Sequence, residues 1–352
     1  MKTVFLAGAC ARAASGACAG ADADAAAHAP IGVMGDHAHA KGERMASYRF
    51  MRMQMGSSLI GTDEVSAETI VTTIANANAP PPTLRVVPED MTMDMHMFGL
   101  MWAPTDRVTL MAMAPYLIKE MDHVTYQGMM GATELGTFRV RTEGFGDVKL
   151  SALVDVAPDA PGRLVANVGV SLPTGSIDET AAVLTPMNTT PTLTTPYAMQ
   201  LGSGTADPFA SLTWAREGER WGWGAQGAAL LRLYDNDQDY RLGDEWKATA
   251  WTSYSVSPAV SASLRLAASS TDSIEGRDAR IAAPVQTANP DFYGGERVDV
   301  GVGLNLSGQE GALHGHRLAL EVVAPIYQDL NGPQMETELV ATIGWQYAWG
   351  GR

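Results

Sequence analysis

The sequence has few cysteines, no long apolar run and an excess of acidic over basic residues, and each shortage excludes a class of protein. Cys10 and Cys18, both near the N-terminus, are the only cysteines, which excludes a disulfide framework for the rest of the chain. No uncharged apolar run of about 18 residues follows the N-terminal stretch, which excludes membrane-spanning helices. The formal net charge of −15 excludes nucleic acid as a partner, because its phosphates would be repelled.

Hydrophobic residues nevertheless make up 46% of the 352 residues, which is enough for a large all-β protein. A transmembrane β-barrel carries its apolar residues at every second position of its strands, so that no continuous apolar run marks them. Two classes therefore remain: a water-soluble all-β protein and an outer-membrane β-barrel.

The first 29 residues resemble a secretory signal peptide, because Lys2 precedes a short apolar run and Ala-x-Ala patterns follow. Arg12 interrupts the apolar run, and cleavage after Ala19 fits the pattern as well as cleavage after Ala29. We predict export of the chain. The predicted domains are a signal peptide over 1–29, a lumenal or periplasmic segment over 30–43 and an outer-membrane β-barrel over 44–349.

Residues 91–119 have the clearest strand pattern. Two alternating runs, each about 11 residues long, flank a turn at 104–107 that contains Pro104 and Asp106. In the first run Phe98, Leu100 and Trp102 lie on the face opposite a row of methionines. This length and alternation predict a hairpin of tilted strands that crosses a bilayer.

The same alternation continues to Trp349 and gives twelve candidate strands. Their connections mostly alternate in length, with short turns at 104–107, 158–162, 216–220 and 257–259 and long loops at 56–90, 120–143, 173–200 and 270–295. Short turns at one end and long loops at the other are typical of bacterial outer-membrane barrels, and they are not expected in a soluble β-sandwich. We therefore predict an all-β fold, a transmembrane antiparallel up-and-down β-barrel of about 12 strands with periplasmic termini, in a Gram-negative outer membrane.

Tryptophans support this orientation, because they collect where membrane meets water. By the predicted strands, five lie at the short-turn end and Trp345 lies slightly further in; the five are Trp102, Trp214, Trp221, Trp223 and Trp349. Asp94 and His96 fall on the lipid-facing side, near the outer end of their strand, which predicts a rim above the hydrocarbon.

The face opposite the aliphatic one is predicted to line the lumen, where buried charges need partners or water. Its polar members are Lys149, Arg232, Lys247, Arg265, Asp299, Arg317, Glu321, Glu336 and Glu338. The first strands instead contribute a methionine stripe, which consists of Met51, Met53, Met93, Met95, Met97, Met101, Met111 and Met113. Sixteen of the nineteen methionines lie within the first 130 residues, which is too skewed for chance composition.

Two interpretations of the methionine stripe compete. Methionine is a flexible filler that gives a lumen an apolar wall or a contact for an N-terminal plug, and this interpretation is favoured. Thioethers also bind Cu(I), and a tentative metal set consists of Met34, His37, His39 and His96. We predict no cofactor, with copper as the alternative.

The sequence does not predict an enzyme. The nearest resemblance to a hydrolase site is His123-Val-Thr125, which lies in a predicted loop and has no third partner.

Several motifs together resemble the family of outer-membrane transporters labelled as the MetA pathway of phenol degradation. They are PIGVMGDH (30–37), MTMDMHMFGLMWAPTDRVTLMAMAPYL (91–117), GFGDVKLSAL (144–153), SLPTGSIDE (171–179), QLGSGTAD (200–207), YQDLNGPQ (327–334) and GWQYAW (344–349). The resemblance covers most of residues 30–349 and implies an outer-membrane barrel that passes small, hydrophobic or aromatic compounds. The chain departs from the pattern in ending with Gly350-Gly-Arg352 after the terminal aromatic residue.

The sequence thus predicts an outer-membrane channel or transporter whose partners are membrane lipid and a small-molecule solute. Two alternatives stay open: a Met/His-lined barrel that binds or passes copper, and a structural barrel without transport. The oligomeric state stays open as well.

Overall fold

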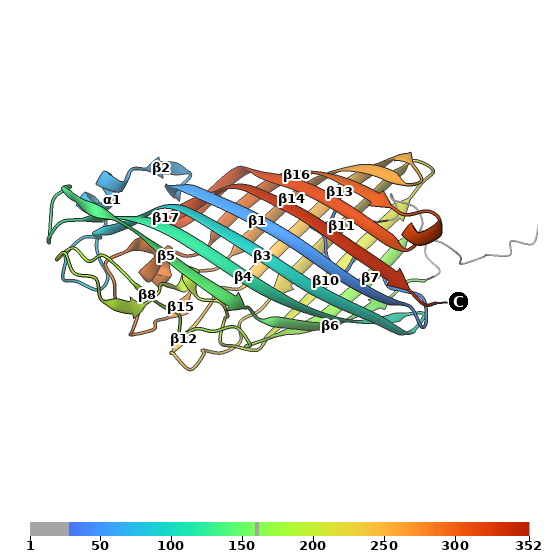
Figure 1. Ribbon diagram of the computed structural model, residues 1–352, viewed down its shortest axis with the longest axis horizontal. Helices are drawn as coiled ribbons and strands as arrows, with labels where there is room; N and C mark the ends of the chain where they lie inside the picture. The colour runs from blue at the N-terminus through green and yellow to red at the C-terminus, as the bar shows by residue number, and fades with distance from the viewer. Residues whose placement is uncertain (1–27, 159–161, 352) are drawn as a thin grey trace, which may run out of the picture.

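The structure is a computed structural model that describes residues 28–158 and 162–351. The predicted signal peptide therefore lies outside the described residues except for His28 and Ala29. The chain forms a closed antiparallel β-barrel with strongly tilted strands (Figure 1). This confirms the predicted fold class.

The strands of the wall follow one another in chain order, and β5 and β6 both pair with β4, so that together they occupy one position. The strands are β1 (Arg44–Gly61), β3 (Val86–Thr105), β4 (Val108–Tyr126), β5 (Glu134–Phe145), β6 (Val148–Asp155), β7 (Arg163–Leu172), β10 (Asp207–Glu217), β11 (Trp221–Leu230), β13 (Glu245–Ser257), β14 (Val260–Thr271), β16 (Gly295–Ser307) and β17 (His316–Trp349).

The last strand, β17, occupies two positions in the ring. Its residues 317–330 pair with β16, and its residues 330–349 pair with β1. All eleven pairings around the ring are antiparallel. In a closed ring of antiparallel neighbours the strand direction alternates, so the number of strands must be even. β17 therefore reverses its direction, and the described wall has twelve antiparallel segments, as predicted.

One end of the barrel is covered by loops, and the C-terminus lies at the opposite end (Figure 1). The loops contain β2 (Asp63–Val65), α1 (Ala67–Thr73), β8 (Thr180–Ala182), β9 (Thr192–Thr194), η3 (Tyr197–Met199), β12 (Tyr240–Arg241), β15 (Glu275–Gly276), η4 (Gln286–Ala288) and η5 (Pro290–Phe292), while η6 (Gly311–Leu313) lies in a turn at the other end. None of the helices in the described ranges is long and apolar enough to cross a membrane.

The loops pack on one another through their own apolar cluster. Tyr197, Tyr240 and Ile281 are buried together in it, with Val86 from the start of β3. Arg85 is fully buried and donates hydrogen bonds to the carbonyls of Gln127, Gly128 and Gly131. The loops at this end are therefore packed into one folded cap.

The predicted loop at 120–143 is wrong over most of its length. β4 continues to Tyr126 and β5 begins at Glu134, so that this hairpin projects as paired strands. Across this ladder Glu120 pairs with Arg141 and Asp122 with Arg139. Cross-strand ion pairs stabilise a polar strand that extends beyond the apolar band.

The outer face has an apolar band bounded by two kinds of polar edge. Near the short turns the exposed tryptophans form a girdle, which consists of Trp102, Trp214, Trp221, Trp223, Trp345 and Trp349. Toward the loops the band ends where Arg52 binds Asp94 and where the hydroxyl of Tyr48 binds His96 at 2.8 Å. Asp94 and His96 are thus on the outer face, as the alternation predicts.

We expect Val302→Arg to lower the free energy of unfolding by about 2–4 kcal/mol, because Val302 lies on the outer face of β16, 59% exposed, where lipid would surround the guanidinium. Denaturant titration in phospholipid vesicles measures this change. Val302→Leu is the matched control and should leave the stability nearly unchanged. Equal stability of the arginine variant would mean that this face does not meet hydrocarbon.

Candidate lumenal site

The methionine stripe lies on the inward face of β1, β3 and β4. The strand register sets Met51 opposite Met95 and Met53 opposite Met93. On the next ladder Met101 faces Met111. All of these positions are odd-numbered, and every second residue of a strand points to the same face. Every methionine predicted for the stripe therefore points to the same side. These side chains therefore form one apolar wall of the lumen.

The N-terminal segment, residues 28–43, lies inside the barrel. Its backbone carbonyls accept hydrogen bonds from inward side chains of β1, β11 and β17: Arg49 binds Ile31 at 3.0 Å, Gln226 binds Met34 at 2.8 Å and Arg317 binds Ala29 at 2.7 Å. A segment that contacts strands so far apart in the ring crosses the lumen.

Between the N-terminal segment and the loops there is a chamber of about 590 Å³. Met93, Met95 and Met97 line one side of it, with Leu117 beside them. Toward the loops it reaches Tyr197 and Tyr293. We call this space the methionine chamber; its lining is apolar on the side of β3 and β4.

Two lysines also line the methionine chamber, beside the methionines: Lys119 pairs with Met93 across the β3–β4 ladder, and Lys149 pairs with Met113 across the β4–β6 ladder. Lys149 lies with its ammonium 5.8 Å from the centre of the Phe209 ring. The ammonium of Lys119 is buried and donates to the carbonyls of Ala198 and Gln200 at 2.9 and 2.6 Å, which ties β4 to the loop above it. The chamber therefore combines an apolar wall with ionic groups of both signs, since Asp147, Glu245 and Asp272 line it as well as the lysines.

A second cavity of about 220 Å³ continues from the chamber toward the N-terminal segment. The two share Met113 and Lys149, and the second reaches Gly32 and Met34 of the segment and Lys247 of the wall. The two cavities thus form one path along the lumen, and the N-terminal segment stands across its inner end.

Four of the charges that the sequence assigns to the lumen form ion pairs, namely Arg232, Arg265, Asp299 and Glu321. Arg265 and Glu321 form a buried bidentate pair at 2.7 and 2.9 Å. The remaining contacts are Arg232 with Asp207 and Glu245, Asp299 with Arg297, Arg317 with Gln346 and Asn305, and Glu336 with Gln328, while Glu338 lies beside Gly56. Where the charges are paired they satisfy one another, so this part of the wall is a salt-bridged filling.

The four residues of the tentative metal set do not come together. His37 and His39 lie in the N-terminal segment with their ring centroids 4.8 Å apart, whereas His96 is on the outer face beside Tyr48. Met34 packs against Met97, Met101 and the other inward methionines. The prediction that His96 joins the set is wrong, because its parity on β3 is opposite to that of the methionines.

Sequence reasoning missed the wall residues that hold the N-terminal segment. Gln226 and Arg49 bond to its backbone, and Trp251 is buried against Ala29 and Val33. The parity of their strands indicates that they face inward. Nothing in the sequence, however, identifies the segment as their partner.

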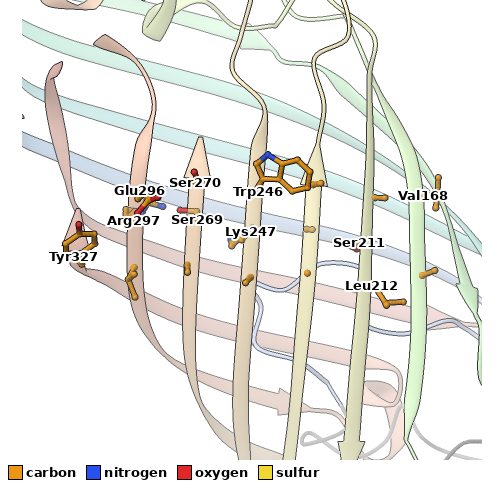
Figure 2. Close-up of a pocket in the computed structure, with 18 residues that line it drawn as sticks. Val168, Ser211, Leu212, Trp246, Lys247, Ser269, Ser270, Glu296, Arg297 and Tyr327 are labelled. Carbon is orange, nitrogen blue, oxygen red and sulfur yellow. The ribbon is translucent and has the colours of Figure 1, made fainter. Parts of the chain in front are cut away.

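On the outer face a hollow of about 750 Å³ crosses several strands of the wall. Figure 2 shows Val168, Leu212, Trp246 and Tyr327 on separate strands around it. Its floor and the inner cavity of about 220 Å³ share small residues such as Ala210 and Ala229. The strand ladder is continuous here, with Ala229 paired to both Ala210 and Trp246, so the wall is thin but closed.

The closed barrel, the outer apolar band and the chambered lumen define an outer-membrane β-barrel of a Gram-negative bacterium. Within that class, the chain belongs to the family described as "Putative MetA-pathway of phenol degradation", whose family model matches residues 83–306.

Among solved structures, an outer-membrane channel from Pseudomonas putida F1 is similar with 16% identity and a TM-score of 0.56, covering 89% of this chain and 98% of that one. This likeness shows the shared fold. A FadL homologue from Pseudomonas aeruginosa has 10% identity and a TM-score of 0.43, covering 87% of this chain and 90% of that one. The toluene transporter TodX from Pseudomonas putida has 10% identity and a TM-score of 0.43, covering 88% and 90%. No curated protein sequence matches the chain.

Proposed function

We propose that the protein is a channel that passes small, largely apolar molecules across the outer membrane through the methionine chamber. The chamber carries the proposal: a space of about 590 Å³ holds a molecule of the size of one or two aromatic rings. Thioether side chains are apolar, polarisable and adaptable, and they contact aromatic rings favourably. The family description, which names phenol degradation, agrees with a solute of this kind.

The two lysines of the chamber suit a solute with one polar group. Lys149 and Lys119 face the same space as Met93 and Met95. A hydroxyl or a carboxylate on an aromatic ring would meet these ammonium groups while the ring rests on the methionines. A purely ionic solute would gain little from the apolar wall.

A channel accounts for these features better than an enzyme. His123, the nearest resemblance to a catalytic residue, stacks on Phe138 with ring centroids 4.7 Å apart, and Thr125 donates to the carbonyl of Leu184. Each side chain is thus occupied by packing. A barrel with a purely structural role has no need of a lined chamber that continues into a second cavity along the lumen.

We expect Met93→Glu, Met95→Glu and Met97→Glu together to reduce uptake of a radiolabelled monoaromatic compound by roughly tenfold or more. The reason is the loss of three apolar contacts, each of the order of about 0.8 kcal/mol. Uptake by porin-deficient cells that produce the protein measures it.

The triple leucine variant at the same positions should retain uptake, because it keeps the apolar wall and removes only sulfur. Met130→Glu, in a loop and 76% exposed, is the matched control for added charge. If the leucine variant lost uptake as fully as the glutamate variant, sulfur itself would be required and the copper alternative would be favoured.

A further inference from the structure

Histidines of the N-terminal segment gather inside the barrel. The ring centroids of His28 and His37 are 5.0 Å apart, and those of His37 and His39 are 4.8 Å apart. One donor atom from each of His28, Asp36 and His37 lies within 4.8 Å of the other two. These residues are all buried, and we call the four of them, His28, Asp36, His37 and His39, the histidine cluster.

The donor atoms of the cluster already have the spacing of metal ligands in part. Asp36 Oδ1 and His37 Nδ1 are 2.9 Å apart, which is a hydrogen-bond distance and somewhat shorter than the separation of two ligands on one tetrahedral zinc ion. Asp36 is held in place because its Oδ2 accepts a hydrogen bond from the backbone of Ala29 at 3.0 Å. The His28 donor lies within 4.8 Å of both, so a local rearrangement of the segment brings the three donors around one ion.

A carboxylate orients the neighbouring imidazole. His39 Nδ1 and Glu43 Oε1 are 3.0 Å apart, so that Nδ1 carries the proton and Nε2 presents its lone pair. Within the described ranges, His39 Nε2 has no hydrogen-bond partner although it is buried. Histidines that bind metal ions are held in this way, by a carboxylate on the nitrogen away from the metal.

His28 presents a second buried nitrogen, Nδ1, without a partner among the described residues. A ligand that satisfies this buried atom is therefore favoured.

We propose that the histidine cluster binds one zinc ion, which joins residue 28 to residues 36–39 and so fixes the folded shape of the N-terminal segment in the lumen. Imidazole nitrogens with one carboxylate oxygen are a common donor set for zinc, in tetrahedral geometry. The methionine stripe takes no part, so the site differs from a thioether site for Cu(I). The inference does not depend on which solute the channel passes.

The site requires that the mature chain retains His28. In the structure His28 and Ala29 are part of the lumenal packing, because Ala29 bonds to both Asp36 and Arg317. We therefore infer that the signal peptide is cleaved upstream, and the position after Ala19 fits. Intact mass of the exported protein decides this point, and a mature chain beginning at Pro30 would overturn the proposal.

The test is isothermal titration calorimetry. The exported protein is stripped of metal with a chelator in detergent and is then titrated with zinc chloride. We expect one zinc ion per chain with a dissociation constant in the micromolar range or below, and no heat with magnesium chloride. His37→Ala and His28→Ala should each weaken binding by about 10- to 100-fold. His96→Ala, which changes the outer-face histidine, is the matched control and should bind as the parent does.

A second measurement uses the position of Lys41 just beyond the cluster. Zinc should slow trypsin cleavage at Lys41 in the parent and in His96→Ala but not in His37→Ala, because the ion stabilises the folded shape of the segment that ends beside Lys41. Absence of zinc binding by the parent, or equal affinity of the parent and His37→Ala, would reject the site. Binding is measured without transport, so either result leaves the proposed channel function to its own test.

Discussion

Deletion of residues 28–39 is expected to change the barrel from a closed to a conducting state, with an increase in single-channel conductance of an order of magnitude or more. The segment stands across the inner end of the lumen, where Ile31 and Val33 are buried and the backbone bonds to strands on several sides. Without it the methionine chamber and the cavity below it open toward the short-turn end. Conductance in a planar bilayer measures this effect.

A disulfide that locks the segment tests the same point without shortening the chain. A Cβ at Gly35 would lie 3.5 Å from that of Asn167, within reach of a disulfide, although Gly35 has φ +69° and any other residue there costs about 1–2 kcal/mol. In the exported protein, which lacks Cys10 and Cys18 after cleavage at Ala19, oxidised Gly35→Cys/Asn167→Cys should block solute uptake, and reduction should restore it.

Two results would contradict the closing role of the segment. Heat-modifiable mobility on a gel shows whether the deletion variant is folded. If the folded variant conducts no better than the parent, the loops close the lumen instead. If the oxidised cysteine pair passes solute as fast as the reduced pair, the segment does not need to move. The single variant Asn167→Cys is the control for the change in the wall.

Glu321→Ala should lower the free energy of unfolding by about 3–5 kcal/mol, because it leaves the Arg265 guanidinium buried without its carboxylate. Both side chains are almost inaccessible, and the N-terminal segment passes directly over them: a Cβ on Gly32 would overlap Glu321 Oε2. Water therefore has little room to replace the lost partner. Denaturant titration of the folded protein in lipid vesicles measures the loss.

The double variant Arg265→Met/Glu321→Met is the decisive comparison, since it removes both charges and keeps the volume. Its stability should return close to that of the parent. Asp94→Ala, which breaks the exposed pair with Arg52, should cost much less because exposed ion pairs are weak. A loss for Glu321→Ala no larger than that for Asp94→Ala would mean that the lumen is hydrated at this level.

The alternation of side chains was sufficient to predict the barrel. The period of two assigns Met93, Met95 and Met97 to the lumen and Val302 to lipid, and each lies on the face that its parity predicts. The period is local, because successive residues of a strand point to opposite faces whatever their neighbours are. Strand ends were harder: the ion pairs that extend β4 and β5 join residues about 20 positions apart, and no local pattern reveals them.

By itself, the sequence determined which residues face inward, where the tryptophan girdle lies and that the chain forms an antiparallel ring. Only the tertiary structure decided what fills that ring. The N-terminal segment has no period, so its path through the lumen depends on side chains such as Gln226 and Arg317, which lie some 190 to 290 residues further along the chain. The pairing of Arg265 with Glu321 and the gathering of the histidine cluster are likewise long-range contacts, which follow from closure of the barrel and not from any local pattern.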